Sequence, residues 1–311
     1  MSGGAIRERD LIRRISEILG GVENDDCALI EAGERYLVAT TDMLHRQTDF
    51  PEIMNPWQIG WMAVAVNLSD IAAMGAEPAG LLMAVGLPPE DDLYFIDELF
   101  SGFRDCAAYY GTRILGGDTD SHQELTVTGT ALGWVEKELV LRRSGARPGD
   151  LLCTTGSLGG AGGGLYAWRE GRLDSPLIEK LLEPEPRLAE GRALAKSGAV
   201  TAMMDNSDGL ALSLSDLSAA SRVGFVVYEE RLPLAEGLEE MVGRERAVEM
   251  AYCAGGDFEL VFSVGRERLE AARQACRLTV IGEVVKEGIW MERDGEWVRL
   301  EAKGYEHMIG I

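Results

Sequence analysis

Aspartates recur in this chain where apolar, strand-like runs end. Three such runs end at Asp42, Asp118 and Asp205. The third is followed closely by a fourth aspartate in the motif Ser207-Asp208-Gly209. A further carboxylate, Asp70, lies on an otherwise apolar helix predicted over 59–75. An unpaired carboxylate on an apolar surface is costly unless it binds a cation or has a raised pKa. Because carboxylates and hydroxyls without thiolate or imidazole suit Mg²⁺, we expect several magnesium ions and, through them, a bound polyphosphate.

Hydroxyl and amide side chains accompany these aspartates. The informative segments are Asp25-Asp26, Thr40-Thr41-Asp42, Asn67-Leu68-Ser69-Asp70, Gly116-Gly117-Asp118-Thr119 and Asp205-Asn206-Ser207-Asp208-Gly209. Taken singly, each aspartate has an ordinary explanation as a turn residue or helix N-cap. Their position at strand ends in both halves of the chain, where ligands gather in α/β folds, favours one common site.

The charge balance restricts the possible partners. The 311 residues include 52 acidic and 30 basic side chains, and the formal net charge of −22 repels nucleic acid and anionic lipid. The same acidity would also suit solubility or a salty cytoplasm. The five cysteines are odd in number and far apart, which favours reduced thiols. Without a secretory leader or a membrane-length apolar run, we expect a soluble, cytoplasmic protein.

The first half of the chain predicts an α+β unit with mixed strand pairing. Its expected helices are 10–19, 57–75 and 90–110, and its expected strands are 26–31, 35–41, 79–86, 112–116 and 124–136. A polar segment rich in Gly and Pro, 142–150, indicates the connection between domains. We therefore divide the chain into domains 1–147 and 148–311.

The second half predicts alternating helices and strands. A Gly-rich run, 156–164, leads into a helix; the other expected helices are 187–197, 209–222 and 266–277, and the expected strands are 200–204, 224–228, 258–264 and 278–285. A hairpin over 289–300 is indicated by its Asp294-Gly295 turn.

Three other motifs have weaker support. The Gly-rich run lacks the following Lys-Ser/Thr of a P-loop and matches the dinucleotide-binding pattern only loosely, so a tight loop at a helix start is favoured. The histidines His45, His122 and His307 have no partner at zinc-ligand spacing. Asp257-Phe258 is followed by Glu259 and not by the glycine of the protein-kinase motif.

Four segments together resemble the thiamine-monophosphate kinase family of the aminoimidazole-ribonucleotide-synthetase-like superfamily. They are Thr41-Asp42, the string Val66-Asn-Leu-Ser-Asp-Ile-Ala-Ala-Met-Gly-Ala76, Gly116-Gly117-Asp118-Thr119 and Ser207-Asp208-Gly209-Leu210. The resemblance extends from about residue 24 to residue 305. It implies an α+β, two-domain fold in which the N-terminal domains pair into a dimeric β-barrel and the C-terminal domain is α/β. ATP and several Mg²⁺ ions would lie between the domains of this homodimer.

The resemblance also implies roles for individual residues. The positions that match metal ligands are Asp26, Thr40, Thr41, Asp42, Asp70, Asp118, Asp205 and Asp208. The positions that match nucleotide contacts are Gly117, Asp118, Arg143 and Ser207, and we expect Asp42, Asp70, Asp118 and Arg143 to be catalytic.

The acceptor side departs from the family pattern at two positions. Where the family usually has Gly-Val-His-Phe, this chain has Gln47-Thr48-Asp49-Phe50, so Asp49 replaces a histidine. In the usual Gly-Gly-Glu-Asp-Tyr-Glu-Leu, Gly256 takes the place of the acidic substrate contact. The aromatic residue near the C-terminus is kept as Tyr305. Asp49 would bind a further metal or pair with the cationic thiazolium, and Tyr305 would stack on the thiamine rings.

The resemblance thus implies an enzyme, a phosphotransferase that uses ATP to convert thiamine monophosphate to thiamine diphosphate in thiamine diphosphate biosynthesis. One alternative is another ATP-using member of the superfamily: a purine cyclo-ligase, a selenophosphate synthase or a hydrogenase-maturation dehydratase. The last two are disfavoured because Cys27 lies in a strand-like run and the chain ends in Met308-Ile309-Gly310-Ile311. A second alternative is a non-catalytic relative that binds Mg²⁺ and nucleotide.

Overall fold

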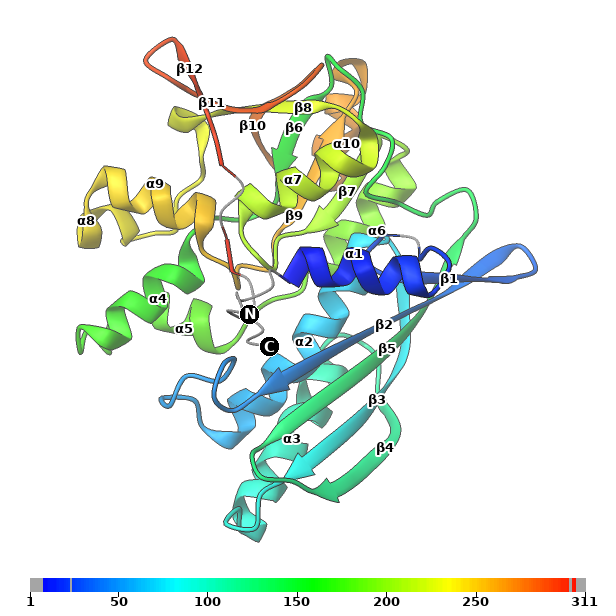
Figure 1. Cartoon of the computed structure of the whole chain (residues 1–311), viewed down its shortest axis with the longest axis vertical. Helices are drawn as coiled ribbons and strands as arrows, with labels where there is room; N and C mark the ends of the chain where they lie inside the picture. Colours follow the sequence, from blue (N-terminus) through cyan, green and yellow to red (C-terminus); the bar gives the residue numbers. More distant parts are fainter. Residues whose placement is uncertain (1–7, 23, 302–303, 306–311) are drawn as a thin grey trace, which may run out of the picture.

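Two β-sheets form the framework of the molecule, with helices around them (Figure 1). The computed structural model describes residues 8–22, 24–301 and 304–305. The first sheet has the strand order β1-β2-β5-β3-β4, with β1 at Ala28–Ala32, β2 at Arg35–His45, β5 at Thr126–Glu136, β3 at Glu77–Leu87 and β4 at Ile114–Ser121. The β3 and β4 strands are parallel and the other pairs are antiparallel, which confirms mixed pairing.

Helices α2 (Pro56–Ala73) and α3 (Leu93–Tyr109) cover one face of this sheet. The α2 helix begins with a capping box between Asn55 and Gln58. It is buried on almost all sides because it also contacts α6 (Leu188–Ser197) and β7 (Val200–Asp205) of the other half. The α2 helix is therefore the wall that the two halves share.

Glycines allow the neighbours of α2 to approach its backbone. A Cβ atom at Gly60 would lie 2.2 Å from the carbonyl oxygen of Leu99 in α3. At the other end, a Cβ atom at Gly191 of α6 would lie 2.2 Å from the carbonyl oxygen of Ala72. Larger residues at these positions would force the helices apart.

The outer face of the first sheet is exposed and partly apolar. Along β5, buried and half-buried residues alternate, which assigns alternate residues to opposite faces. Four large apolar side chains of this sheet are exposed: Ile30, Met43, Leu82 and Leu115. No helix of the described residues comparable to α2 covers them, and such a surface is typical of an interaction site.

The second sheet has seven strands in the order β12-β11-β8-β10-β6-β9-β7. Besides β7, these are β12 (Glu296–Arg299), β11 (Ile289–Arg293), β8 (Gly224–Tyr228), β10 (Thr279–Val285), β6 (Leu151–Thr154) and β9 (Leu260–Val264). Only the β8–β11 pair is parallel. Around it lie α4 (Gly160–Arg169), α5 (Leu177–Leu182), α7 (Leu210–Ser221), α8 (Leu238–Val242), α9 (Arg244–Cys253) and α10 (Leu269–Ala275). The Asp294-Gly295 turn has φ values of 53° and 84°, so the predicted hairpin is confirmed.

Two sequence expectations need correction. The strand-like runs do not end at Asp42 and Asp118, since β2 continues to His45 and β4 continues to Ser121. Strand pairing with β5 and β3 holds these polar residues in extended backbone although they interrupt the apolar pattern. Of the predicted strand ends, the one at Asp205 is confirmed.

The other elements that the sequence predicted agree with the structure in kind. The first helix, α1, spans Glu8–Ile18 and so begins two residues before the expected start. All five cysteines lie in the described part of the chain, and none forms a disulfide. Among the described helices, none combines the length and the apolar character that crossing a bilayer requires.

Candidate active site

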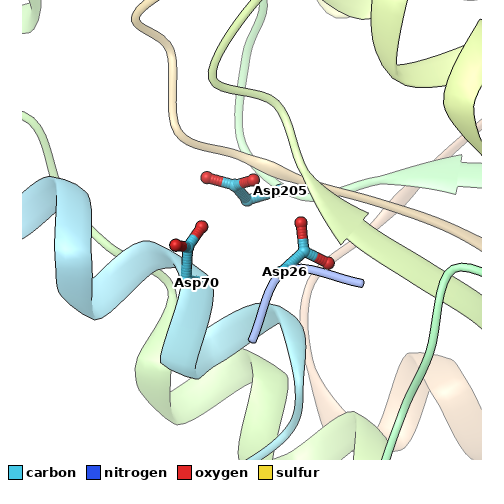
Figure 2. A group of neighbouring side chains, drawn as sticks. All are labelled: Asp26, Asp70 and Asp205. Atoms are coloured by element: carbon cyan, nitrogen blue, oxygen red, sulfur yellow. The ribbon is translucent and has the colours of Figure 1, made fainter. Parts of the chain in front are cut away.

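Three aspartates from both halves of the chain converge at one point (Figure 2). Asp26 precedes β1, Asp70 lies on α2, and Asp205 ends β7. One carboxylate oxygen from each lies within 4.8 Å of the other two. Ser69, beside Asp70 on α2, donates a hydrogen bond of 2.6 Å to Asp205 across the boundary between the halves.

The electrostatics of this cluster favour a cation. Burial, together with the charge of the neighbouring Asp26, raises the pKa of Asp205 to about 8. Burial also raises the pKa of Asp70 well above its usual value, with Asp42 and Asp205 adding to the effect. The buried Oδ2 atoms of Asp26 and Asp42 have no hydrogen-bond partner among the described residues. Such orphaned oxygens, in a donor set of carboxylates and hydroxyls, fit a hard divalent cation such as Mg²⁺.

Strand β2 adds Thr40 and Asp42 to the same face. Thr40 donates a hydrogen bond to Asp70. The backbone N–H of Asp42 donates to Asn67 of α2 at 3.3 Å. The Asn67 amide occupies the space that a side chain at Gly129 would need, since a Cβ there would lie 2.2 Å from its nitrogen. Burial, followed by the charge of Asp208, raises the pKa of Asp42 to about 6.

Arginines border the cluster. Arg143 donates to Asp26 from two nitrogens at 2.5 and 3.1 Å. Burial alone would lower the pKa of this guanidinium, but Asp26 and other carboxylates hold it above its usual value. Arg9 of α1 pairs with Asp216 at 2.8 Å and with Asp208 at 3.5 Å. Burial raises the pKa of Asp208, and Arg9 opposes this effect.

The structure places two predicted site residues, Thr41 and Asp118, on the outer face of the first sheet. Thr41 lies between Thr40 and Asp42 and therefore points to the opposite side, where it contacts Thr130 at 3.2 Å. Asp118 pairs with Ala84, an exposed residue of β3. Gly117, in contrast, lies in the inner-face row of paired residues that leads across Met83 and Gly129 to Asp42. Three strand spacings of about 4.8 Å separate the ends of this row, so a single chain does not bring Asp118 to the cluster.

A cleft of about 1540 Å³ adjoins the cluster. Asp42, Ser207 and Asp208 line it on one side, and the predicted acceptor residues Asp49, Gly256 and Tyr305 also line it. Its apolar wall includes Ile59, Met62 and Val66 of α2, together with Phe50, Trp168 and Phe258. The cleft can therefore hold a ligand with both charged and aromatic parts.

Sequence reasoning did not assign a role to Asp257. This buried carboxylate accepts hydrogen bonds from the backbone N–H groups of Gly159 at 2.6 Å and Ala161 at 3.0 Å, at the start of α4. Burial raises its pKa to about 7, and the backbone N–H donors oppose this effect. Next to it, Glu259 forms a two-point ion pair with Arg187 at 2.6 and 2.8 Å. The sequence contains both the Asp257-Phe258-Glu259 segment and the distant Gly-rich run, but only the fold shows that these two segments meet.

The sequence likewise gave no indication that Arg9 lies beside the cluster. Its charged neighbours, Glu8 and Asp10, make the segment look like an ordinary solvated helix start. No local pattern reveals that Asp216 lies opposite.

Comparison with known proteins places the chain among AIR synthase related proteins. Residues 24–135 match the N-terminal domain of that family and residues 147–290 match its C-terminal domain. The thiamine-monophosphate kinase of Methanospirillum hungatei is 43% identical over 96% of this chain and 99% of its own length. That of Halobacterium salinarum is 41% identical over 95% of this chain and 99% of its own.

A solved structure, described as AaThiL complexed with AMPPCP and TMP, superposes with a TM-score of 0.89. It is 29% identical, and the match covers 97% of both chains. The chain thus has the two-domain fold of AIR synthase related proteins, as the sequence predicted.

Proposed function

The chain belongs to the thiamine-monophosphate kinase family, and we propose that the cleft beside the aspartate cluster is where it phosphorylates thiamine monophosphate with ATP. The observation that carries this proposal is the convergence of Asp26, Asp70 and Asp205 within 4.8 Å. A phosphotransferase between two anionic phosphates needs a group of this kind to hold divalent cations. The apolar wall of the cleft offers a matching place for the rings of the acceptor.

The reaction needs no general base. An oxygen of the acceptor phosphate attacks the γ-phosphorus of ATP while the bond from this phosphorus to the bridging oxygen breaks. The electron pair leaves on the β-phosphate of ADP, and thiamine diphosphate is formed. A phosphate monoester is largely ionised near neutral pH, so no proton has to be removed from the attacking oxygen. This agrees with the absence of histidine from the described residues of the cluster.

We propose that Asp26, Thr40, Asp42, Asp70, Asp205 and Asp208 hold the Mg²⁺ ions. Bound Mg²⁺ would cancel the repulsion between donor and acceptor phosphates and favour their in-line alignment. The carboxylates would hold these ions in fixed positions because they are themselves held by Thr40, Ser69 and Arg143. Arg143, which pairs with Asp26 in this structure, would bind phosphate with two parallel hydrogen bonds, which a lysine cannot do. Ser207 would contact the nucleotide from the same side of the cleft.

Gly117 and Asp118 act on the nucleotide within a homodimer in this proposal. Both lie on the strand at the edge of the first sheet, away from the aspartate cluster of their own chain. Two such sheets that face each other would form a closed barrel and bury Ile30, Met43, Leu82 and Leu115. The barrel would also give Thr41 and Asp118 a partner surface. Catalysis by Asp118 and metal binding by Thr41 and Asp118 are therefore proposed for the dimer.

We further propose that the domains are 1–147 and 148–311, and that the enzyme works in the cytoplasm. The boundary falls in the segment between the end of β5 at Glu136 in the first sheet and the start of β6 at Leu151 in the second. The expected C-terminal α/β domain then contains the second sheet and its helices.

A direct assay tests the proposed function. The protein is incubated with Mg²⁺, ATP and thiamine monophosphate, and thiamine diphosphate and ADP are separated by chromatography. We expect both products in equal amounts, with none formed in the presence of EDTA. Formation of ADP without thiamine diphosphate would show that the acceptor is another molecule.

A further inference from the structure

The loop after β2 holds one carboxylate in a fixed orientation at the edge of the cleft. Asp49 Oδ2 accepts hydrogen bonds from the backbone N–H of His45 at 2.8 Å and from the Thr48 hydroxyl at 2.7 Å. These two bonds fix the plane of the carboxylate. They leave Oδ1 directed toward the other side of the cleft, where the hydroxyl of Tyr305 lies at 3.5 Å.

Tyr305 reaches this position from the C-terminal end of the chain. Its backbone N–H donates to the carbonyl oxygen of Asp208 at 3.0 Å, which ties it to the loop after β7. Burial, together with the charge of Asp49, raises the pKa of the Tyr305 phenol to about 12. The phenol thus stays neutral and donates to Asp49, and 43% of the residue remains exposed to the cleft.

The opposite loop cannot readily supply a second carboxylate. Gly256 has a φ of +94°, a backbone conformation that residues with a side chain rarely adopt. A Cβ atom there would also lie 3.1 Å from the Cβ of Ala161. The N–H of Gly256 is fixed by a 2.7 Å hydrogen bond to the carbonyl oxygen of Ser207. At this part of the cleft, Asp49 therefore supplies the negative charge that the loop at Gly256 does not.

We propose that Asp49 determines specificity for an acceptor with a positively charged ring, which it holds against the face of Tyr305. This inference rests on the proposed function, since it concerns the acceptor of the same reaction. A carboxylate fixed by two hydrogen bonds does not have to be ordered when the ligand binds, so its attraction to the cation is kept. A neutral ring of the same shape would fill the cleft without this attraction.

The test compares two acceptors that differ only in ring charge. Thiamine monophosphate carries a thiazolium, whereas 3-deazathiamine monophosphate carries a neutral thiophene of nearly the same shape. For each acceptor, kcat/KM is measured with wild-type enzyme and with Asp49→Asn under saturating Mg-ATP. We expect the wild type to prefer the cationic acceptor and the Asp49→Asn substitution to reduce this preference by about fivefold to tenfold, mainly through KM.

Two variants serve as controls. Glu52→Gln removes a carboxylate that also lines the cleft and should leave the preference unchanged. Tyr305→Phe removes the hydroxyl but keeps the ring, so it should retain most of the preference. An Asp49→Asn variant that loses activity equally with both acceptors would overturn the proposal, because a residue that merely holds the loop or a metal has that effect. A wild type that forms no thiamine diphosphate would instead refute the proposed function itself.

Discussion

Asp70→Asn should stabilise the metal-free protein while it removes the response to magnesium. The substitution keeps the shape of the side chain and an oxygen that can accept from Thr40. It removes one of three carboxylates whose oxygens lie within 4.8 Å of one another. Two like charges at that separation repel by about 3.5 kcal/mol at an effective dielectric constant of about 20. The wild type avoids part of this cost by keeping protons in the cluster.

The sign of the pH dependence follows from the raised pKa values. The pKa values of Asp42 and Asp205 are about 6 and about 8, above those of an unfolded chain. The folded state therefore binds more protons between about pH 4 and about pH 8, and metal-free stability falls as the pH rises through this window. At about pH 9 in EDTA, we expect the variant to be more stable by about 2 kcal/mol, or roughly 4 to 8 °C in Tm. The difference should shrink toward about pH 5.

Thermal unfolding with EDTA and with millimolar Mg²⁺ provides the assay. Magnesium should raise the Tm of the wild type, because it binds the folded state and replaces the protons of the cluster. It should raise the Tm of the Asp70→Asn variant much less. Asp174→Asn, at an exposed position, is the matched control and should behave like the wild type. The reasoning is refuted if Asp70→Asn is less stable than the wild type in EDTA at high pH and responds equally to magnesium.

Three further predictions concern activity and assembly. Asp42→Asn and Asp118→Asn should each lower kcat by about 10²-fold or more with little loss of stability, measured as steady-state ADP release, and near wild-type turnover would remove these residues from the mechanism. ATP binding should require Mg²⁺ because the net charge of −22 repels bare nucleotide; equal affinities by calorimetry with and without EDTA would contradict this. The protein should sediment as a dimer, and Leu82→Arg on the outer sheet face should dissociate it, whereas Leu93→Arg on the exposed side of α3 should not. A wild type that sediments as a monomer at micromolar concentration would exclude the barrel.

Periodic segments were predictable because their pattern extends over many residues. The apolar α2 and the long strands β3 and β5 were expected close to their observed bounds. Strand β6, Leu151–Thr154, is too short to show a period, although pairing with β9 and β10 places it inside the second sheet. The α9 helix, Arg244–Cys253, was also missed, and tertiary contact with α4 and α7 supports it there.

The candidate site, like the fold, was predictable from the sequence only in part. The sequence predicted that Asp26, Asp70 and Asp205 share a function, and the fold brings them together. It did not predict that Asp118 lies on the other face of its sheet, because a motif carries no information about which face a residue occupies until the strand register is known. The pairing of Arg9 with Asp216 was likewise invisible, since the two residues are far apart in the chain.

The glycines along α2 have a mechanical consequence. At Gly60 this helix touches the backbone of α3, and at Ala72 it is met by Gly191 of α6, so neither contact has room for a larger side chain. Asp70 lies two residues from the second contact, and Ile59, Met62 and Val66 form the cleft wall along the same rod. A single added methyl group at Gly191 would therefore be expected to displace the Asp70 carboxylate and the apolar cleft wall together. One tightly packed helix thus carries both the Asp70 carboxylate and part of the apolar wall of the cleft.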